Sequence, residues 1–333
     1  MALKEGAPPR SIASLPHPDN RAYFPNKIPE VILTNEILQR AGKDNLIYAL
    51  EYGSQVGGDA SRNSMHDIIV IVQDVKKFHR ENLKLHKGDY AQPHLASFHS
   101  FLNQFGFNFY LTHARGENGQ VVPLKMAVIS REDFIKGCNN VLPEKDAERK
   151  KAFGLYIAGR VQKAALVPLY KLENDESSAA IESAINTARI DGVWLALGLL
   201  KKQFSFDELL QMYVSLSYKA DVRVEKPDKV KMLIENNRSD YEEMMEPIIQ
   251  GFIENGLIKQ NGELFEKITS LSEKEVNKRL IEFKIITFLT NYLKNPLTSG
   301  ITQGIVYALK KIARVADHCI KTQLKSKNTT KLH

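Results

Sequence analysis

Five consecutive β-branched residues, Ile68 to Val72, restrict the fold of this 333-residue chain more than any other feature. A strand with one wet face alternates apolar and polar side chains, whereas an unbroken run is typical of a strand buried on both faces. A single carboxylate, Asp67, begins the run, and a Gly53–Ser54 pair opens the short polar loop before it. The sequence therefore predicts one acid at the mouth of a buried strand, beside a loop that glycine makes adaptable.

The neighbouring segments predict an α+β first half. Residues 35–50 carry apolar side chains at helical spacing, interrupted by Gly42, and residues 75–86 also follow a helical pattern. Residues 105–113 and 121–130 are predicted strands, joined by a hairpin turn with the sequence RGENGQ. Helix, strand, helix and hairpin together indicate a compact α+β unit.

The second half is predicted to be mostly helical. Residues 181–202, 205–218 and 240–257 show a periodicity of about 3.6 residues. No internal repeat is visible, which excludes solenoid architectures. The predicted organisation is an extended arm at 1–34, an α+β domain at 35–172, a helical domain at 173–295 and a basic amphipathic segment at 296–333.

Composition narrows the class of protein. Hydrophobic residues make up 43% and charged residues 26% of the chain, as in globular proteins. The net charge of +7 favours anionic partners such as nucleotides, nucleic acid or acidic lipid, although a soluble basic protein fits equally well. No apolar run approaches the ~18 residues that cross a bilayer. Two distant cysteines without a Cys-x-x-Cys pair favour a reducing compartment, and the N-terminus favours a cytoplasmic, bacterial protein over an organellar precursor.

The Gly-Ser loop and the acid suit phosphate chemistry. Glycine allows close approach of backbone N–H groups to a triphosphate, and the Ser54 hydroxyl adds a donor. An aspartate fixed at the start of a strand can bind Mg²⁺ that bridges the phosphates. Gly53, Ser54 and Asp67 are therefore predicted to hold a nucleotide and its metal. The alternative is that Gly-Ser and Asp67 only form a turn.

Six ordered blocks indicate a family. They are YGS from Tyr52, the strand led by Asp67, FHxxNL from Phe78, KxxVIS from Lys125, LYxxGRxQK from Leu155 and LSYxxDxR from Leu216. Together they resemble the mitochondrial-type phosphatidate cytidylyltransferases, which are peripheral CDP-diacylglycerol synthases of the translocator assembly and maintenance protein family. The resemblance resumes at residues 296–315. It implies a polymerase-β-like nucleotidyltransferase domain followed by a winged-helix-like domain, and transfer of CMP from CTP to phosphatidic acid with Mg²⁺.

The resemblance assigns roles to the residues of these blocks. Asp67, Lys125 and His79 would be catalytic, with Asp67 also the metal ligand, while Tyr52, Gly53, Ser54 and Asn82 would bind the nucleotide. Arg160, Lys163, Tyr218, Asp221 and Arg223 would bind phosphatidate. Alternatives remain at single positions: Lys125 as a solvated lysine, His79 as a buried structural residue, and Asp221 as the ion-pair partner of Arg223.

One departure leaves the metal site incomplete. Polymerase-β-type enzymes carry Asp-x-Asp on this strand, but the second position here is Ile69. The next acid, Asp74, is seven residues from Asp67, roughly 23 Å along an extended strand. Asp74 is better placed as the N-cap of the helix that follows. A second metal ligand must therefore come from elsewhere in the chain or from the substrate.

The C-terminal residues 301–327 have the pattern of a basic amphipathic helix. Apolar side chains recur there at three- and four-residue steps, with lysines and an arginine between them. Such a helix suits contact with an anionic membrane, although an ordinary packing helix with a wet basic face is equally common. We expect the protein to lie on the inner face of the cytoplasmic membrane, or on the matrix side of the mitochondrial inner membrane.

Two other functions remain compatible with the sequence. One is a nucleotidyltransferase that modifies another acceptor, such as RNA or a protein hydroxyl. The other is an inactive basic adaptor for a membrane or nucleic acid, in which the missing second carboxylate marks a dead site. The preferred partners are CTP, phosphatidic acid and an anionic membrane, with no nucleic acid expected.

Overall fold

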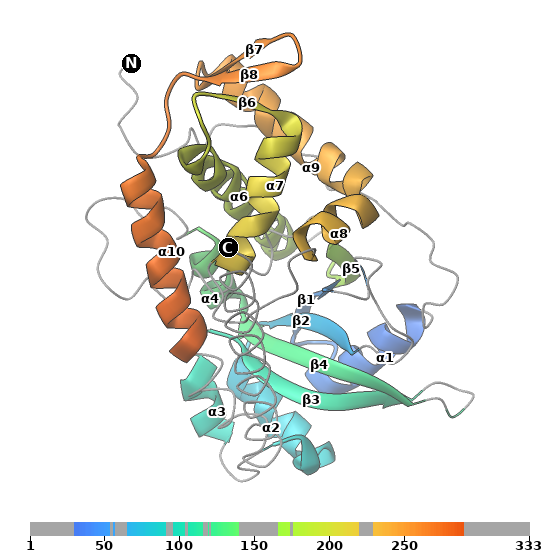
Figure 1. Ribbon diagram of the computed structural model, residues 1–333. Helices are drawn as coiled ribbons and strands as arrows, with labels where there is room; N and C mark the ends of the chain where they lie inside the picture. Colours follow the sequence, from blue (N-terminus) through green and yellow to red (C-terminus); the bar gives the residue numbers. More distant parts are fainter. Residues whose placement is uncertain are drawn as a thin grey trace, which may run out of the picture.

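The computed structural model describes residues 30–53, 56, 65–90, 96–103, 106–115, 119, 121–139, 166–173, 176–219 and 229–289 (Figure 1). A five-stranded mixed sheet has the order β3-β4-β2-β1-β5. β2 runs parallel to β4 and antiparallel to β1, and β3 and β5 are antiparallel to their neighbours. The strands are β1 (Leu46–Tyr52), β2 (His66–Val72), β3 (Asn108–Arg115), β4 (Val121–Ser130) and β5 (Leu166–Lys171).

Helices cover both faces of this sheet, as the unbroken apolar run predicts. One face packs on α1 (Glu30–Ala41) and α2 (Val75–Leu85), with α3 (Ala96–Asn103) and the short 3₁₀ helix η1 (Lys87–Asp89) nearby. The other face packs on α4 (Arg131–Cys138) and the 24-residue α6 (Glu176–Leu199), as Figure 1 shows. Ile68 to Val72 are all fully buried, which confirms the predicted strand and the α+β class.

Strand β2 divides its side chains between two cores. Ile68 and Val70 belong to a cluster with Phe78 of α2. Ile69 and Ile71 belong to a larger cluster that includes Phe134 of α4. Since successive side chains of a strand point to opposite faces, Asp67 lies on the α4–α6 face and His66 on the α1–α2 face.

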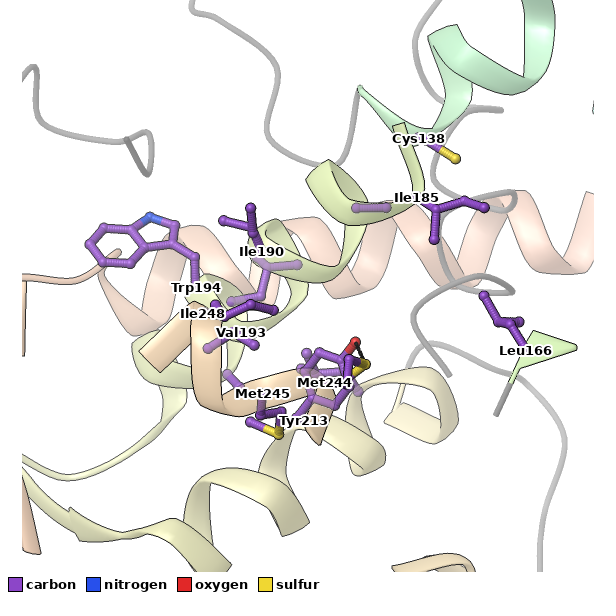
Figure 2. Packing of buried hydrophobic residues seen from close by; sticks show 14 of the residues in the cluster. Cys138, Leu166, Ile185, Ile190, Val193, Trp194, Tyr213, Met244, Met245 and Ile248 are labelled. Atoms are coloured by element: carbon purple, nitrogen blue, oxygen red, sulfur yellow. Dashed lines mark hydrogen bonds between the residues drawn. The ribbon is translucent and has the colours of Figure 1, made fainter. Parts of the chain in front are cut away.

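The second half is built around α6. It contains α7 (Phe206–Lys219), α8 (Lys229–Asn236), α9 (Arg238–Glu254), α10 (Glu273–Phe288) and a small antiparallel sheet, β6 (Gln203–Ser205), β8 (Leu264–Lys267) and β7 (Ile258–Asn261). Figure 2 shows Tyr213 of α7 and Met244 and Met245 of α9 gathered against α6. The three helices predicted there are present with slightly different ends, whereas the small sheet was not predicted. The predicted boundary at 172/173 falls between β5 and α6, but one cluster of buried side chains joins the two halves.

The prediction of a helix over 35–50 is wrong in its second half. The helix ends at Ala41, and Gly42 takes a φ of +78°, which suits glycine at a helix C-terminus. Leu46 to Tyr52 then form β1, because this apolar segment is hydrogen-bonded between β2 and β5. The prediction that Asp74 caps the next helix is confirmed, since its Oδ1 accepts from the Lys77 N–H at 2.9 Å.

Within the described ranges, no helix is long and apolar enough to cross a membrane. The predicted arm at 1–34, apart from the start of α1, and the predicted segment at 296–333 lie outside these ranges.

Candidate active site

Asp67 and Lys125 form an ion pair on the α4–α6 face of the sheet. They are directly opposite each other on the parallel strands β2 and β4, so their side chains share one face. The Lys125 ammonium donates to Asp67 Oδ1 at 2.8 Å. The Asp67 side chain is 25% exposed and the Lys125 side chain 17%, whereas the rest of β2 is buried. The pair is therefore open to a ligand at the mouth of the buried strand.

Gly53 lies directly against this carboxylate. Its φ is +97°, a conformation that residues with a side chain rarely adopt. A Cβ at this position would lie 2.8 Å from Asp67 Oδ2. Glycine is required here both for the turn out of β1 and for the close approach of the backbone to Asp67.

Tyr52 is opposite Asp67 on β1, but its side chain is buried in the core shared with α6. The structure thus brings the Tyr52 backbone to the site and not its ring, so the predicted nucleotide contact is not supported for the side chain. Ser54 lies outside the described residues.

The ammonium of Lys125 also lies over the ring of Phe109, 4.7 Å from its centre. A cation at this distance is attracted by the electron-rich ring face. Phe109 was not singled out in the sequence, because only strand pairing places it beside Lys125. The aromatic ring and the carboxylate together hold the ammonium at a fixed place on the sheet.

His79 and Asn82 lie on the other face of the sheet from Asp67. His79 is fully buried, and its Nδ1 is 3.2 Å from the Tyr90 hydroxyl, which also accepts from Asn82 Nδ2 at 2.8 Å. Asn108 Nδ2 lies 3.2 Å from His79 Nε2, so both ring nitrogens have polar neighbours inside the core. Burial raises the pKa of the Tyr90 hydroxyl, which stays protonated. The predicted catalytic and nucleotide-binding roles are not supported, because the sheet separates both side chains from Asp67.

A second polar pair, on the α1–α2 face of the sheet, was not predicted from the sequence. His66 Nδ1 lies 2.6 Å from Glu51 Oε1, and both side chains are buried. Each residue directly precedes one at the site, His66 before Asp67 and Glu51 before Tyr52. The pair links the ends of β2 and β1 from behind. Strand alternation alone gives no signal for it, because pairing requires the β1–β2 register.

Most of the residues predicted to bind phosphatidate lie outside the part of the chain that the structure describes. Tyr218 is half-buried near the end of α7 and packs against the core. Arg160, Lys163, Asp221 and Arg223 fall in segments that the structure does not describe.

Metal-binding potential near Asp67 is restricted. In the part of the chain that the structure describes, no group of three or more His, Cys, Asp or Glu side chains is placed to hold a metal ion. Asp74 is used in capping α2 at the other end of β2. A Mg²⁺ ion needs only one or two protein carboxylates when substrate phosphates supply further ligands. Asp67 therefore fits a metal that arrives with a nucleotide and does not form a dedicated metal cage.

Comparison with known proteins points to one family. The family model described as "Phosphatidate cytidylyltransferase, mitochondrial" matches residues 34–282. Proteins of that name are similar to this chain in Saccharomyces cerevisiae (27% identity, 79% of this chain and 66% of the relative), Drosophila melanogaster (25%, 59% and 56%) and Schizosaccharomyces pombe (27%, 60% and 49%). The chain thus spans less than two thirds of the length of these relatives.

Proposed function

Since the chain belongs to the family of mitochondrial phosphatidate cytidylyltransferases, we propose that it transfers CMP from CTP to phosphatidic acid, giving CDP-diacylglycerol and pyrophosphate. The observation that carries this proposal is the partly exposed Asp67–Lys125 pair beside Gly53, at the start of a buried strand. Phosphoryl transfer of this type depends mainly on positioning and charge neutralisation, for which these residues are suited.

The reaction needs no general base in this site. An oxygen of the phosphatidate phosphate attacks the α-phosphorus of CTP, and the bond to the β-bridging oxygen breaks, so pyrophosphate leaves with the electron pair. A phosphate monoester has a second pKa of about 6, so the attacking oxygen carries no proton at neutral pH. The burial of His79 behind the sheet is compatible with this chemistry.

The residues of the site then take separate roles. Gly53 and Ser54 would hold the triphosphate, and Asp67 would help to hold Mg²⁺. When bound, Mg²⁺ neutralises charge on the phosphates. Lys125 leaves Asp67 for the phosphate oxygens as the nucleotide enters, because its ammonium occupies the place that a cation takes beside the carboxylate. Phe109 keeps the ammonium near the sheet during this exchange.

We also propose a more specific fold class for each half of the chain. We assign the mixed sheet, with its Gly53 turn and Asp67 strand, to the polymerase-β-like nucleotidyltransferase class. The helices around α6 and the small β6-β8-β7 sheet are the components of a winged-helix-like domain. The match to the family model over residues 34–282 spans both units.

Contact with a membrane follows from the lipid substrate. We place it at residues 301–327, whose sequence combines basic residues with apolar ones at three- and four-residue steps, and helix α10, which precedes them in the chain, supports this choice. Three of its apolar side chains are more than 45% exposed, namely Ile281, Ile285 and Phe288. They recur at four- and three-residue steps, so they share one side of the helix. We propose a peripheral location on a membrane, with mitochondria as the site that the names of the relatives suggest.

The direct test is release of pyrophosphate from each of the four nucleoside triphosphates, with Mg²⁺ and vesicles that contain phosphatidic acid. Of the four nucleotides, we expect only CTP to release pyrophosphate. The release should depend on phosphatidic acid and be accompanied by CDP-diacylglycerol. Turnover of CTP that ignores phosphatidic acid would indicate another acceptor. Absence of turnover with every nucleotide would favour the adaptor function.

The membrane contact is tested by deleting residues 299–333. We expect binding to anionic vesicles and activity on vesicles to fall together, because each lysine near such a surface is worth about 1 kcal/mol. Activity on a short-chain, water-soluble phosphatidic acid should persist, and high salt should reproduce the deletion in the full chain. A truncated protein that binds vesicles normally would place the contact elsewhere.

A further inference from the structure

The sheet face that carries Asp67 and Lys125 continues along the hairpin of β3 and β4. In the outer half of this hairpin, the even-numbered side chains are buried and the odd-numbered ones are exposed or half-exposed. Lys125 belongs to the odd-numbered set, so the exposed row lies on its side of the sheet. This row consists of Leu111, His113 and Arg115 on β3 with Pro123 and Val121 on β4.

The row is chemically divided along its length. His113 is opposite Pro123, and Arg115 is opposite Val121, whose side chain is 53% exposed. The outer end of the edge strand β3 therefore presents hydrogen-bond donors and a positive charge at His113 and Arg115, while the outer end of β4 presents apolar groups at Val121 and Pro123. A ligand that is anionic on one side and apolar on the other matches this surface, as does a phosphate monoester attached to acyl chains.

The order of the strands separates two sides of Asp67. β2 lies between β1, which leads into Gly53, and β4, which carries Lys125. A triphosphate held by the Gly53 turn reaches Asp67 from the β1 side. In an in-line displacement the attacking and leaving oxygens lie on opposite sides of the phosphorus. With pyrophosphate leaving toward Gly53, the acceptor must approach from the side of Lys125.

We infer that the exposed row of the hairpin is the acceptor subsite, which binds the phosphate monoester of phosphatidic acid. The inference rests on the proposed function and adds the location of its second substrate. His113 and Arg115 lie about 7 Å and 14 Å along β3 from Leu111, the residue opposite Lys125. Along this row His113 lies between Arg115 and Lys125, and we place the acceptor phosphate beside His113. Val121 and Pro123 contact the apolar part of the lipid.

Arg115→Gln tests the charge, with the Michaelis constants for CTP and short-chain phosphatidic acid measured separately. We expect the constant for phosphatidic acid to rise about tenfold or more, as for loss of a hydrogen bond to a charged group. The constant for CTP should stay within twofold. The matched control is Arg80→Gln, which removes the same charge from an exposed arginine of α2, on the other side of the sheet. It should leave both constants unchanged.

Val121→Asp provides a second, independent variant. It places a negative charge in the acceptor path and should also raise the constant for phosphatidic acid without affecting that for CTP. Glycerol 3-phosphate has the phosphate monoester but lacks the acyl chains, so it should bind the wild-type protein more weakly than short-chain phosphatidic acid does. Equal binding of the two compounds would show recognition of the phosphate alone and would overturn the role of Val121 and Pro123.

The outcomes distinguish failure of the proposed function from failure of the acceptor subsite. If the wild-type protein releases no pyrophosphate from CTP and phosphatidic acid, the proposed function fails. If it is active but Arg115→Gln matches Arg80→Gln, or raises the constant for CTP instead, the acceptor subsite is elsewhere. Circular-dichroism melting of each variant establishes that the comparison is made on folded protein.

Discussion

The two faces of the central sheet carry similar residue types in opposite environments. On the α4–α6 face, Asp67 and Lys125 form an ion pair that remains partly exposed. On the α1–α2 face, Glu51 and His66 form a pair that is almost completely buried. Only the first pair can exchange its partner for a ligand without opening the core.

The buried face also contains a network around Arg40. Its guanidinium donates to Glu36 at 2.5 Å, to Asp89 at 2.6 Å and to the Thr112 hydroxyl at 2.7 Å, joining α1, η1 and β3. Arg40 is 3% exposed. Buried charges of this kind are costly unless each has its partners, so the network contributes to stability and specificity of packing. The polar groups on the two sides of one sheet thus differ in solvent access: the Asp67–Lys125 pair can be reached by a ligand, and the groups behind it contribute to packing.

The largest expected effect is at the partly exposed Asp67–Lys125 pair. Asp67→Asn should lower kcat/KM about thousandfold, or about 4 kcal/mol, because it removes the charge that would hold the metal in the proposed mechanism. The melting temperature should hardly change. Asp74→Asn is the matched control at the other end of β2, since asparagine caps a helix as well as aspartate does. Activity of Asp67→Asn above a tenth of wild type would exclude Asp67 as the metal ligand.

The next effect belongs to the buried face and should appear in stability alone. Arg40→Met should lower the free energy of unfolding by about 3 kcal/mol, because the carboxylates of Glu36 and Asp89 lose their shared cation. Denaturant titration measures this loss, and kcat on the folded fraction should stay within twofold. A large fall in kcat without loss of stability would mean that the two faces do not divide the roles in this way.

Gly53→Ala tests the close approach of the Gly53 backbone to the Asp67 carboxylate. The Cβ should displace the Asp67 carboxylate and lower kcat/KM at least tenfold, in addition to a backbone cost of about 1–3 kcal/mol in stability. Gly106→Ala is a matched control, because Gly106 has a φ of +98° but nothing within 4 Å of an added Cβ. It should show the loss of stability without the loss of activity. Equal activities of the two variants would contradict the importance of the Gly53–Asp67 approach.

The smallest effect is expected from Ser54→Ala. Loss of one hydrogen bond to a charged phosphate oxygen should weaken CTP binding roughly tenfold, or about 1.5 kcal/mol, with little change in stability. Equilibrium binding of CTP to the variant measures it directly. Unchanged affinity and rate would show that Ser54 only completes the turn.

Local sequence patterns predicted those parts of the fold that depend on neighbouring residues. The β-branched run gave the buried strand, the return strand over 121–130 has the predicted ends, and Asp74 caps α2 as expected. Residues 35–50 were mispredicted as one helix, because Leu46 to Leu50 become a strand only through pairing with β2 and β5. Local propensity cannot supply that information.

The sequence by itself determined that an acid begins a buried strand and that a glycine precedes it in the chain. The tertiary structure decided which polar residues meet. The register of β2 and β4 brings Lys125 to Asp67, and the packing of α2 places His79 behind the sheet. A strand pattern indicates that neighbouring side chains point to opposite faces, but their exposure depends on the helices that cover each face. Those helices come from distant parts of the chain, so long-range packing leaves Asp67 partly exposed and buries His66.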